Sequence, residues 1–375
     1  MVHTGAVSLR VLELLGPSAG GIRLHVAELS RRLPDHDVDP TVAGPAGVMD
    51  GVGRQDHTIE VPAMWDLFGY RRARRRFLEL RAGVDVVHVH GLKAGVVAVG
   101  APDGPPVVLT VHNLVAGTQP TPVRQLLARV ETWIARRADH VIVISDEIEA
   151  RFAPVVDACS RTFVLPVSPP RTPTRSPAEV RAEYGIAPDA PLVTIVARHH
   201  RQKNLPMFLE AMALVRAGRP DVRALMVGDG PEREAIERRR DELGLSATVV
   251  VAGTRPNPAD EMCAAGVVAL SSDWEGSPLV VAECLALGRP LVTTDVGTVG
   301  RHLVDGVTAR VVPVGDAAAF AAAIVDLIEH PDRAAELAAA GRRVAATTFD
   351  PDALTAAVAA VYRRVVDAAR DAARG

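Results

Sequence analysis

The feature that most constrains the fold is an alternation of short apolar runs with longer amphipathic stretches, which occurs in two series along the chain. In the first series, RLHVAELSRRL (23–33) and VRQLLARVETWIARRA (123–138) have the apolar spacing of helices. Short apolar runs separated by helices indicate strand–helix–strand units and a parallel sheet. The predicted strands are LRVLELL (9–15), VDVVHVH (84–90), PVVLTVH (106–112) and HVIVIS (140–145).

A proline-rich stretch, LPVSPPRTPTRSPAEV (165–180), follows the first series and has the composition of a linker. The alternation then begins again, with helices predicted over 204–216, 231–243 and 278–287. We therefore expect an α/β protein with two αβα domains. The predicted strands of the second series are 192–198, 222–228, 248–253, 267–272, 290–295 and 309–314.

Two alanine-rich stretches near the end of the chain predict long helices over 316–346, with a break near Pro331, and over 351–373. The second begins with Asp350 and Pro351, an N-cap residue followed by proline in the first helical position. The domain boundaries that follow are an N-terminal domain at 1–168, a linker at 169–180, a C-terminal domain at 181–350 and a final helix at 351–375.

Composition excludes several classes of protein. A length of 375 residues suits two domains rather than one core. The formal charge of −3 argues against a dedicated nucleic-acid binder, which would normally be basic. The three cysteines have no metal-binding spacing, so a reduced, cytoplasmic setting is the simplest interpretation. No apolar run approaches the ~20 residues that span a bilayer.

Candidate binding residues in the first half lie at the ends of predicted strands. Gly20 and Gly21 precede a helix, where exposed backbone N–H groups and the helix dipole suit an anion, although a plain turn is an equal alternative. His112 ends a strand, where open α/β sheets bind ligands, and a solvated histidine remains the alternative. His88 and His90 share a strand face, but no third metal ligand is evident, so we assign no metal site.

In the second half, cations and a glycine turn follow two predicted strands. Arg198 and Lys203 flank a strand–helix connection, and Lys203 is one of only two lysines among 42 basic residues. Two cations at the end of a strand can bind a diphosphate, whereas the alternative is an ordinary pair of surface charges. The turn Gly228-Asp229-Gly230 precedes a proline at a helix start and is at least structural.

The densest signal is SSDWEGSPLVVAECLALGRPLVTTDVG (271–297). Glu275 lies in a loop after a predicted strand, from which it could contact a sugar. The backbone N–H groups of Leu279 and Val280 lie at the following helix N-terminus, where they suit a phosphate. Glu283, inside that helix, could accept hydrogen bonds from a ribose diol.

This stretch resembles the signature of the retaining glycosyltransferases of family 4. The similar segments here are EGSP, VVAECLALG, GRPLVTT and DVGTVG, followed by LVDGVTARVVPVGD (303–316). Earlier segments also match, namely GGIRLHVAELSRRL, TVHN, VAR-x4-K and VGDGPE. The resemblance covers nearly the whole chain in the family's order, and it departs from the usual pattern at Ser277-Pro278 and Gly300-Arg301. It implies the GT-B fold, two Rossmann-like αβα domains facing each other across a cleft, with residues 351–375 packing back on the N-terminal domain.

The resemblance also implies a role for each candidate. The donor diphosphate would bind Gly20, Gly21, Arg198, Lys203, Leu279 and Val280, and the ribose would bind Glu283. His112 and Glu275 would be the catalytic residues that hold the transferred sugar. Gly228, Asp229, Gly230 and Arg255 would lie near the base. Arginine, lysine and the helix dipole would replace a divalent cation, so the resemblance implies no metal and no cofactor.

The expected function is therefore a retaining hexosyltransferase that moves a sugar from a UDP- or GDP-sugar to an acceptor hydroxyl in saccharide, glycolipid or glycoconjugate biosynthesis. Two alternatives remain open: a nucleotide-sugar epimerase of the same fold, and a non-catalytic nucleotide-binding partner protein. The sequence names neither the sugar nor the acceptor.

The stretch YRRARRRFLEL (70–80) places five arginines in a predicted helix. In similar membrane-associated enzymes such a helix contacts anionic lipid, which would place this chain at the inner face of the membrane. The alternative is a solvated face in an arginine-rich chain.

Overall fold

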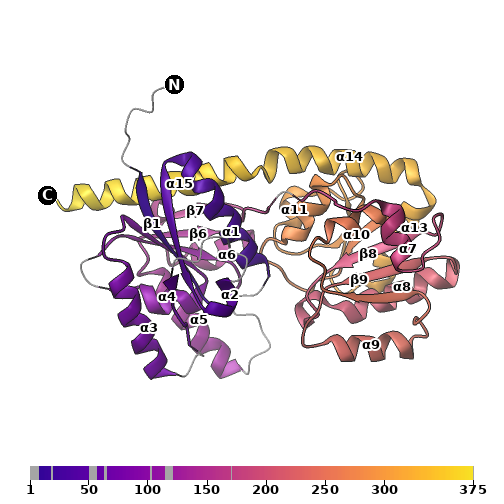
Figure 1. Ribbon diagram of the computed structural model, residues 1–375, viewed down its shortest axis with the longest axis horizontal. Coiled ribbons are helices and arrows are strands. Elements are labelled where there is room, and N and C mark those ends of the chain that lie inside the picture. The colour runs from indigo at the N-terminus through magenta and orange to yellow at the C-terminus, as the bar shows by residue number, and fades with distance from the viewer. Residues whose placement is uncertain are drawn as a thin grey trace. The chain divides into compact units, whose positions relative to one another are not determined.

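The computed structural model describes residues 8–17, 20–49, 57–62, 66–101, 104–114, 121–169 and 171–374. The chain forms two compact units (Figure 1). Unit 1 consists of Met1–Pro169 together with Asp350–Gly375, and unit 2 consists of Pro170–Phe349. Unit 1 is therefore built from two segments that are far apart in the sequence.

Unit 1 contains a seven-stranded parallel sheet in the order β3-β2-β1-β4-β5-β6-β7. Side chains alternate between the two faces of each strand, so both faces carry apolar residues that need cover. The strands are β1 Leu9–Leu15, β2 Val38–Gly44, β3 His57–Thr58, β4 Val86–His90, β5 Val107–Val111, β6 His140–Val143 and β7 Arg161–Phe163.

Helices cover both faces of this sheet (Figure 1). One face, which includes Leu12 and Val87, packs against α3 Leu67–Leu80, α4 Leu92–Ala98, α5 Thr121–Ala135 and α6 Asp146–Phe152. The opposite face, which includes Val11 and Val86, packs against α1 Gly21–Arg32, η1 Leu33–His36 and α15 Pro351–Ala372. The short elements α2 Ala46–Met49 and η2 Ala158–Ser160 complete the unit.

Unit 2 contains a six-stranded parallel sheet in the order β10-β9-β8-β11-β12-β13. Its strands are β8 Leu192–Val196, β9 Arg223–Val227, β10 Val249–Gly253, β11 Val267–Leu270, β12 Leu291–Thr294 and β13 Arg310–Val312. One face packs against α8 Leu205–Gly218 and α13 Ala317–Glu329, and the other against α7 Pro177–Glu183, α10 Ala259–Ala264, α11 Leu279–Ala286 and α14 Pro331–Thr348. The remaining elements are η3 Arg201–Lys203, α9 Arg233–Glu242 and α12 Val299–His302.

The two parallel sheets confirm the predicted fold class. The region expected as a linker is shorter in the structure, because α7 begins at Pro177, where Ser176 and Glu179 form a capping box. Thr174 and Arg175, also in that region, donate backbone hydrogen bonds to Asp260 of unit 2. Pro170 lies outside the described residues. None of the helices within the described ranges combines the length and apolar content needed to cross a lipid bilayer.

Candidate functional site

Each sheet has one position where the strand order reverses direction, between β1 and β4 in unit 1 and between β8 and β11 in unit 2. In open α/β sheets, ligands bind beyond the carboxyl ends of the strands at this position. Most of the predicted site residues follow these strands: Gly20 and Gly21 follow β1, Arg198 and Lys203 follow β8, and Glu275 follows β11.

In unit 2, the loops after β8 and β11 are joined by their side chains. The ammonium group of Lys203 pairs with Oε1 of Glu275, whose side chain is only 8% exposed. Ser272 donates its hydroxyl to the same carboxylate at 2.7 Å, and Gln202 donates an amide N–H to Oε2 at 3.3 Å. The structure thus brings together two residues that the sequence placed in separate roles, one on the diphosphate and one on the sugar.

The start of α8 fixes the position of Lys203. Asn204 adopts the left-handed backbone conformation, with φ of 40°, and its side chain caps the helix by accepting from the N–H of Met207 at 3.2 Å. Its amide also donates to Asp273 at 2.6 Å, and Ser271 donates to the carbonyl of Lys203 at 2.7 Å. A short polar residue tolerates this conformation better than most side chains do. These bonds hold Lys203 beside the carboxyl end of β11.

The helix α11 begins beyond β11 without a capping side chain. Pro278 occupies its N-cap position, so the N–H groups of Leu279 and Val280 lie at an uncapped N-terminus. One helical turn further, Glu283 is buried, and its Oε1 accepts a hydrogen bond from Nε of Arg171 at 2.8 Å. The sequence suggested no role for Arg171, which lies in the stretch expected to be a linker.

The turn after β9 packs closely on the segment that contains Arg198. Gly228 has φ of 132°, and a Cβ there would lie 2.0 Å from the carbonyl oxygen of Ala197. The backbone carbonyl of Asp229 accepts a hydrogen bond from the N–H of His199 at 2.9 Å. A Cβ on Gly230 would lie 2.4 Å from the carbonyl oxygen of His199, so the backbone approaches closely here too. The side chain of Arg198 is exposed, and within the described part of the chain no hydrogen bond or ion pair involves its guanidinium. This cation is therefore available to an anionic ligand.

Two other predicted residues have different surroundings. Arg255 donates from Nε to the hydroxyl of Tyr184 at 2.6 Å and pairs with Glu183 at 3.0 Å, so its guanidinium is bound to the end of α7. In unit 1, Gly20 has φ of 93° and Gly21 begins α1 without a side-chain cap. A Cβ on Gly20 would meet no atom within 4 Å, so space is not the reason for glycine here. The positive φ of the backbone is what favours glycine at this position.

His112 belongs to a buried polar network at the carboxyl ends of β1, β4 and β5. Nδ1 of His90 lies 3.2 Å from Nε2 of His112, and Nε2 of His90 bonds to the carboxylate of Glu13. The other oxygen of Glu13 accepts from the hydroxyl of Tyr362 in α15 at 2.8 Å. That hydroxyl also lies 2.6 Å from Nδ1 of His88. These side chains share one face of the sheet because they alternate along adjacent strands.

Burial controls the protonation of this network. Desolvation lowers the pKa of His90 to about 4, despite the opposing charge of Glu13. Burial and the neighbouring histidines lower the pKa of His112 well below its usual value, and burial lowers that of His25 to about 3. Burial alone would raise the pKa of Glu13, but the charges and hydrogen bonds of His88 and His90 outweigh it, so this pKa is below its ordinary value. The carboxylate is therefore ionised near neutral pH, and these three histidines are neutral.

The same residues have the composition of a metal site, which corrects the expectation that no third ligand accompanies His88 and His90. In the described chain, two overlapping sets place their ligand atoms within 4.8 Å of one another: His25, His90 and His112, and Glu13, His88 and His90. Protein hydrogen bonds occupy most of these atoms, including Nδ1 of His25, which accepts from the N–H of Val167 at 2.8 Å. The arrangement already satisfies a hydrogen-bond network without an ion.

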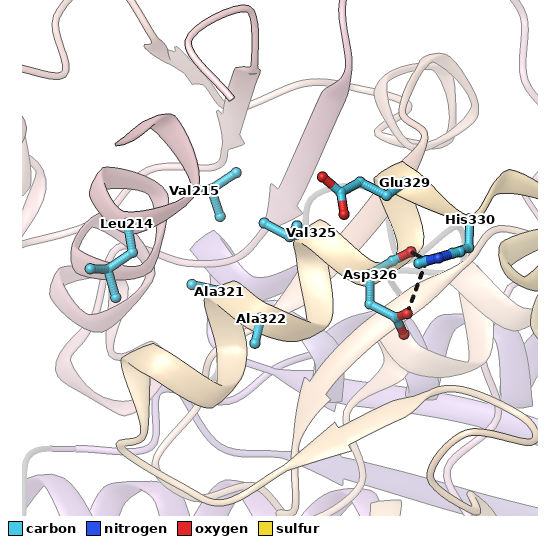
Figure 2. A pocket seen from close by; sticks show the side chains of 8 residues that line it. All are labelled: Leu214, Val215, Ala321, Ala322, Val325, Asp326, Glu329 and His330. Carbon is cyan, nitrogen blue, oxygen red and sulfur yellow. Dashed lines mark hydrogen bonds and ion pairs between the residues drawn. The ribbon is translucent and has the colours of Figure 1, made fainter. Parts of the chain in front are cut away.

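A separate hollow of about 400 Å³ lies on unit 2 between α8 and α13 (Figure 2). Leu214, Val215 and Val325 give it an apolar wall. Its polar end contains Asp326 and His330, whose ring nitrogen and carboxylate oxygen are 3.2 Å apart. None of the predicted site residues lines it.

Comparison with known proteins agrees with this architecture. Residues 19–167 match the family described as glycosyltransferase family 4, and residues 190–330 match glycosyl transferases group 1. D-inositol 3-phosphate glycosyltransferase of Mycobacterium avium is 30% identical over 90% of this chain and 81% of its own length. The chain belongs to this glycosyltransferase family.

Other similarities are more limited in extent or identity. Alpha-D-kanosaminyltransferase of Streptomyces kanamyceticus is 32% identical over 50% of this chain, and the chain spans about half (49%) of that relative. The crystal structure of HepE of Anabaena in complex with UDP and glucose matches with a TM-score of 0.81 at 20% identity, covering 95% of this chain and all of that one. This structural likeness shows that the chain has the GT-B fold.

Proposed function

We propose that this protein is a retaining glycosyltransferase that transfers a sugar from a nucleoside-diphosphate donor to an acceptor hydroxyl without a metal ion. One observation carries the proposal: the loops after β8 and β11 meet at the switch point of the unit 2 sheet, and they bring Lys203 and Glu275 together. A cation paired with an oriented carboxylate suits a ligand that combines phosphate with sugar hydroxyls. HepE, which has the same fold, binds UDP and glucose.

The diphosphate would be bound by fixed charges and backbone dipoles. Arg198 has an exposed guanidinium, and Lys203 has three ammonium donors, so it can bind Glu275 and a phosphate oxygen together. The uncapped N–H groups of Leu279 and Val280 add a partial positive charge. These groups would stabilise the charge that develops on the leaving diphosphate, which is the role that a divalent cation has in other enzymes. Excess EDTA should therefore leave the rate of transfer unchanged.

Glu275 and His112 would hold the transferred sugar, and Glu283 would bind the ribose. For Glu283 to accept from a ribose, its bond to Arg171 must be shared or replaced. Retention would follow from attack of the acceptor on the face that the diphosphate leaves. The bond from the anomeric carbon to the phosphate oxygen breaks, the bond to the acceptor oxygen forms, and the diphosphate takes the acceptor proton.

A screen of UDP- and GDP-sugars by thermal shift and by hydrolysis would identify the donor. D-inositol 3-phosphate, which is named in the M. avium relative, is a reasonable first acceptor in the screen. Formation of a product with the donor's anomeric configuration supports the proposal. Interconversion of the donor sugar without any acceptor would instead indicate an epimerase, and binding of nucleotide without turnover would indicate a partner protein.

Substitutions at the paired residues test the assignment of the site. Lys203→Ala should weaken binding of UDP or GDP about 10- to 100-fold, because a hydrogen bond to a charged group contributes about 1.5–3 kcal/mol. Glu275→Ala should retain nucleotide binding but lose most sugar transfer. Arg219→Ala is a matched control, since it removes a surface cation that pairs with nearby Asp221 and lies outside the proposed site. Unchanged nucleotide affinity in the Lys203 variant would contradict the phosphate assignment.

We also propose that α3 contacts anionic lipid. Its first turn exposes Leu67 (76%) and Phe68 (80%), and Arg71, Arg72 and Arg75 are exposed on the same helix. Apolar side chains beside arginines are typical of helices that lie on a membrane surface.

Sedimentation with phosphatidylglycerol-containing vesicles tests this contact. The protein should bind at low salt and dissociate at high salt, because surface charges are then screened. Replacement of Leu67 and Phe68 by alanine should reduce binding several-fold, whereas Leu214→Ala, at an exposed leucine of unit 2, should have no effect. Equal sedimentation with and without vesicles would contradict the proposal.

A further inference from the structure

The buried network around His112 contains two residues that the proposed function does not use. Glu13 lies within the apolar strand β1, and His90 ends β4. Both side chains are fully buried. They are connected in series, because the carboxylate of Glu13 bonds to one nitrogen of His90 and the other nitrogen of His90 lies beside His112. A buried carboxylate destabilises the fold unless it is paired, so the presence of Glu13 beside His90 calls for an explanation.

The direction of each hydrogen bond follows from the chemistry of its members. An ionised carboxylate can only accept, so Nε2 of His90 must carry the proton that is donated to Glu13. Neutral His90 then has no proton on Nδ1, which can only accept. The partner of that atom is Nε2 of His112 at 3.2 Å, which must therefore be the donor. Neutral His112 is left with an unprotonated Nδ1.

We infer that Glu13 and His90 are positioning residues that hold His112 in the tautomer protonated on Nε2, so that its Nδ1 accepts a hydrogen bond from a hydroxyl of the bound sugar. The identity of the ligand rests on the proposed function, but the tautomer does not. A histidine fixed in this way selects a ligand group that donates a proton. It would disfavour a carbonyl or an ether oxygen at the same position.

Other groups around the network reinforce this direction. Tyr362 donates its only hydroxyl proton to the second oxygen of Glu13, so the carboxylate is held on both sides. Because that proton is used, the hydroxyl accepts from Nδ1 of His88. His25 accepts the N–H of Val167 on Nδ1, so when neutral it carries its proton on Nε2. If His90 were protonated, the hydrogen bond between His90 and His112 would reverse, because Nδ1 of His90 would then donate to Nε2 of His112.

The tautomer can be measured in the unmodified full-length protein by nitrogen NMR of ¹⁵N-labelled histidines near pH 7.5. The signals of His112 are assigned by their absence in His112→Asn. The inference predicts a protonated-type Nε2 and an unprotonated-type Nδ1. A proton on Nδ1, an imidazolium, or an equal mixture of tautomers would overturn it. Stoichiometric zinc in the purified protein, measured by mass spectrometry, would also overturn it, because an ion would then set the tautomer.

A variant separates positioning from general damage. Glu13→Gln offers an N–H₂ group as well as an oxygen, so His90 is no longer obliged to donate, and the His112 signals should change to a mixture of tautomers. His140→Gln is the control, because His140 is a buried histidine on β6 whose ring bonds to Thr162 and lies outside the network. Its substitution should leave the His112 signals unchanged.

Affinity measurements then connect the tautomer to the ligand. Glu13→Gln should weaken binding of UDP-glucose or GDP-mannose about three- to tenfold, in line with one lost hydrogen bond, with the affinity for UDP or GDP unchanged. Equal weakening of nucleotide and nucleotide sugar would overturn the positioning role. If no nucleotide sugar binds the native protein, the proposed function fails, and the NMR result still decides the tautomer.

Discussion

At the scale of single residues, the neutral histidines of unit 1 give the protein a defined response to acid. Burial lowers the pKa of His25 to about 3 and that of His90 to about 4, against 6.5 in an unfolded chain. At a pH between the folded and the unfolded pKa of each histidine, the unfolded chain binds more protons than the folded chain. The free energy of unfolding therefore falls as the pH falls. Glu13 adds to this fall only below about pH 4.5, where the unfolded chain binds a proton that the folded carboxylate, with its lowered pKa, does not bind.

We therefore expect the free energy of unfolding to fall by at least about 4 kcal/mol between pH 7.5 and pH 5.5, because each of the neutral histidines His25, His90 and His112 contributes about 1.4 kcal/mol. Urea unfolding at both pH values measures this difference. His90→Gln should remove about 1.4 kcal/mol of it, because one of these titrating groups is then absent. A free energy of unfolding that stays constant over this range would contradict the assignment of neutral histidines.

At the scale of elements, apolar periodicity predicted the regular strands and missed the irregular ones. The strand β2, VDPTVAG, contains Pro40 and two polar residues, so its sequence does not resemble a central strand. It forms because Val38 to Ala43 pair in register with β1. The short strands β3 and β7 are likewise defined by their neighbours. Pairing partners far away in the sequence are not visible in a local pattern.

The candidate site shows the same limit. Positions at strand ends identified Arg198, Lys203, Glu275 and His112, because strand ends are recognisable from apolar runs. The side chains that bond to these residues could not be predicted from strand ends. Glu13 is a single carboxylate inside an apolar strand, which was the one available signal that a buried partner exists.

At the scale of the whole molecule, the chain completes unit 1 only with its last segment. The helix α15 lies on the sheet face opposite α3 and α4 (Figure 1). It buries Val358, Val361, Tyr362, Val365 and Val366. At roughly 1.5 kcal/mol or more for each buried side chain, these contacts contribute at least about 7 kcal/mol. That is comparable to the total stability of an ordinary domain. Unit 2, in contrast, is one continuous segment with apolar clusters on both faces of its sheet.

We therefore expect residues 170–349 to fold when expressed alone, with a cooperative thermal transition, and to bind the same nucleotide as the full chain.

Residues 1–169 alone should lack a cooperative transition, because the apolar face under α15 and the carboxylate of Glu13 would lose their cover. Co-expression of 350–375 with 1–169 should restore the transition. The same segment with Tyr362→Phe should restore it less well, since Glu13 and His88 would each lose a hydrogen-bond partner. Circular dichroism during heating measures all four cases, and cooperative unfolding of 1–169 by itself would contradict this account of unit 1.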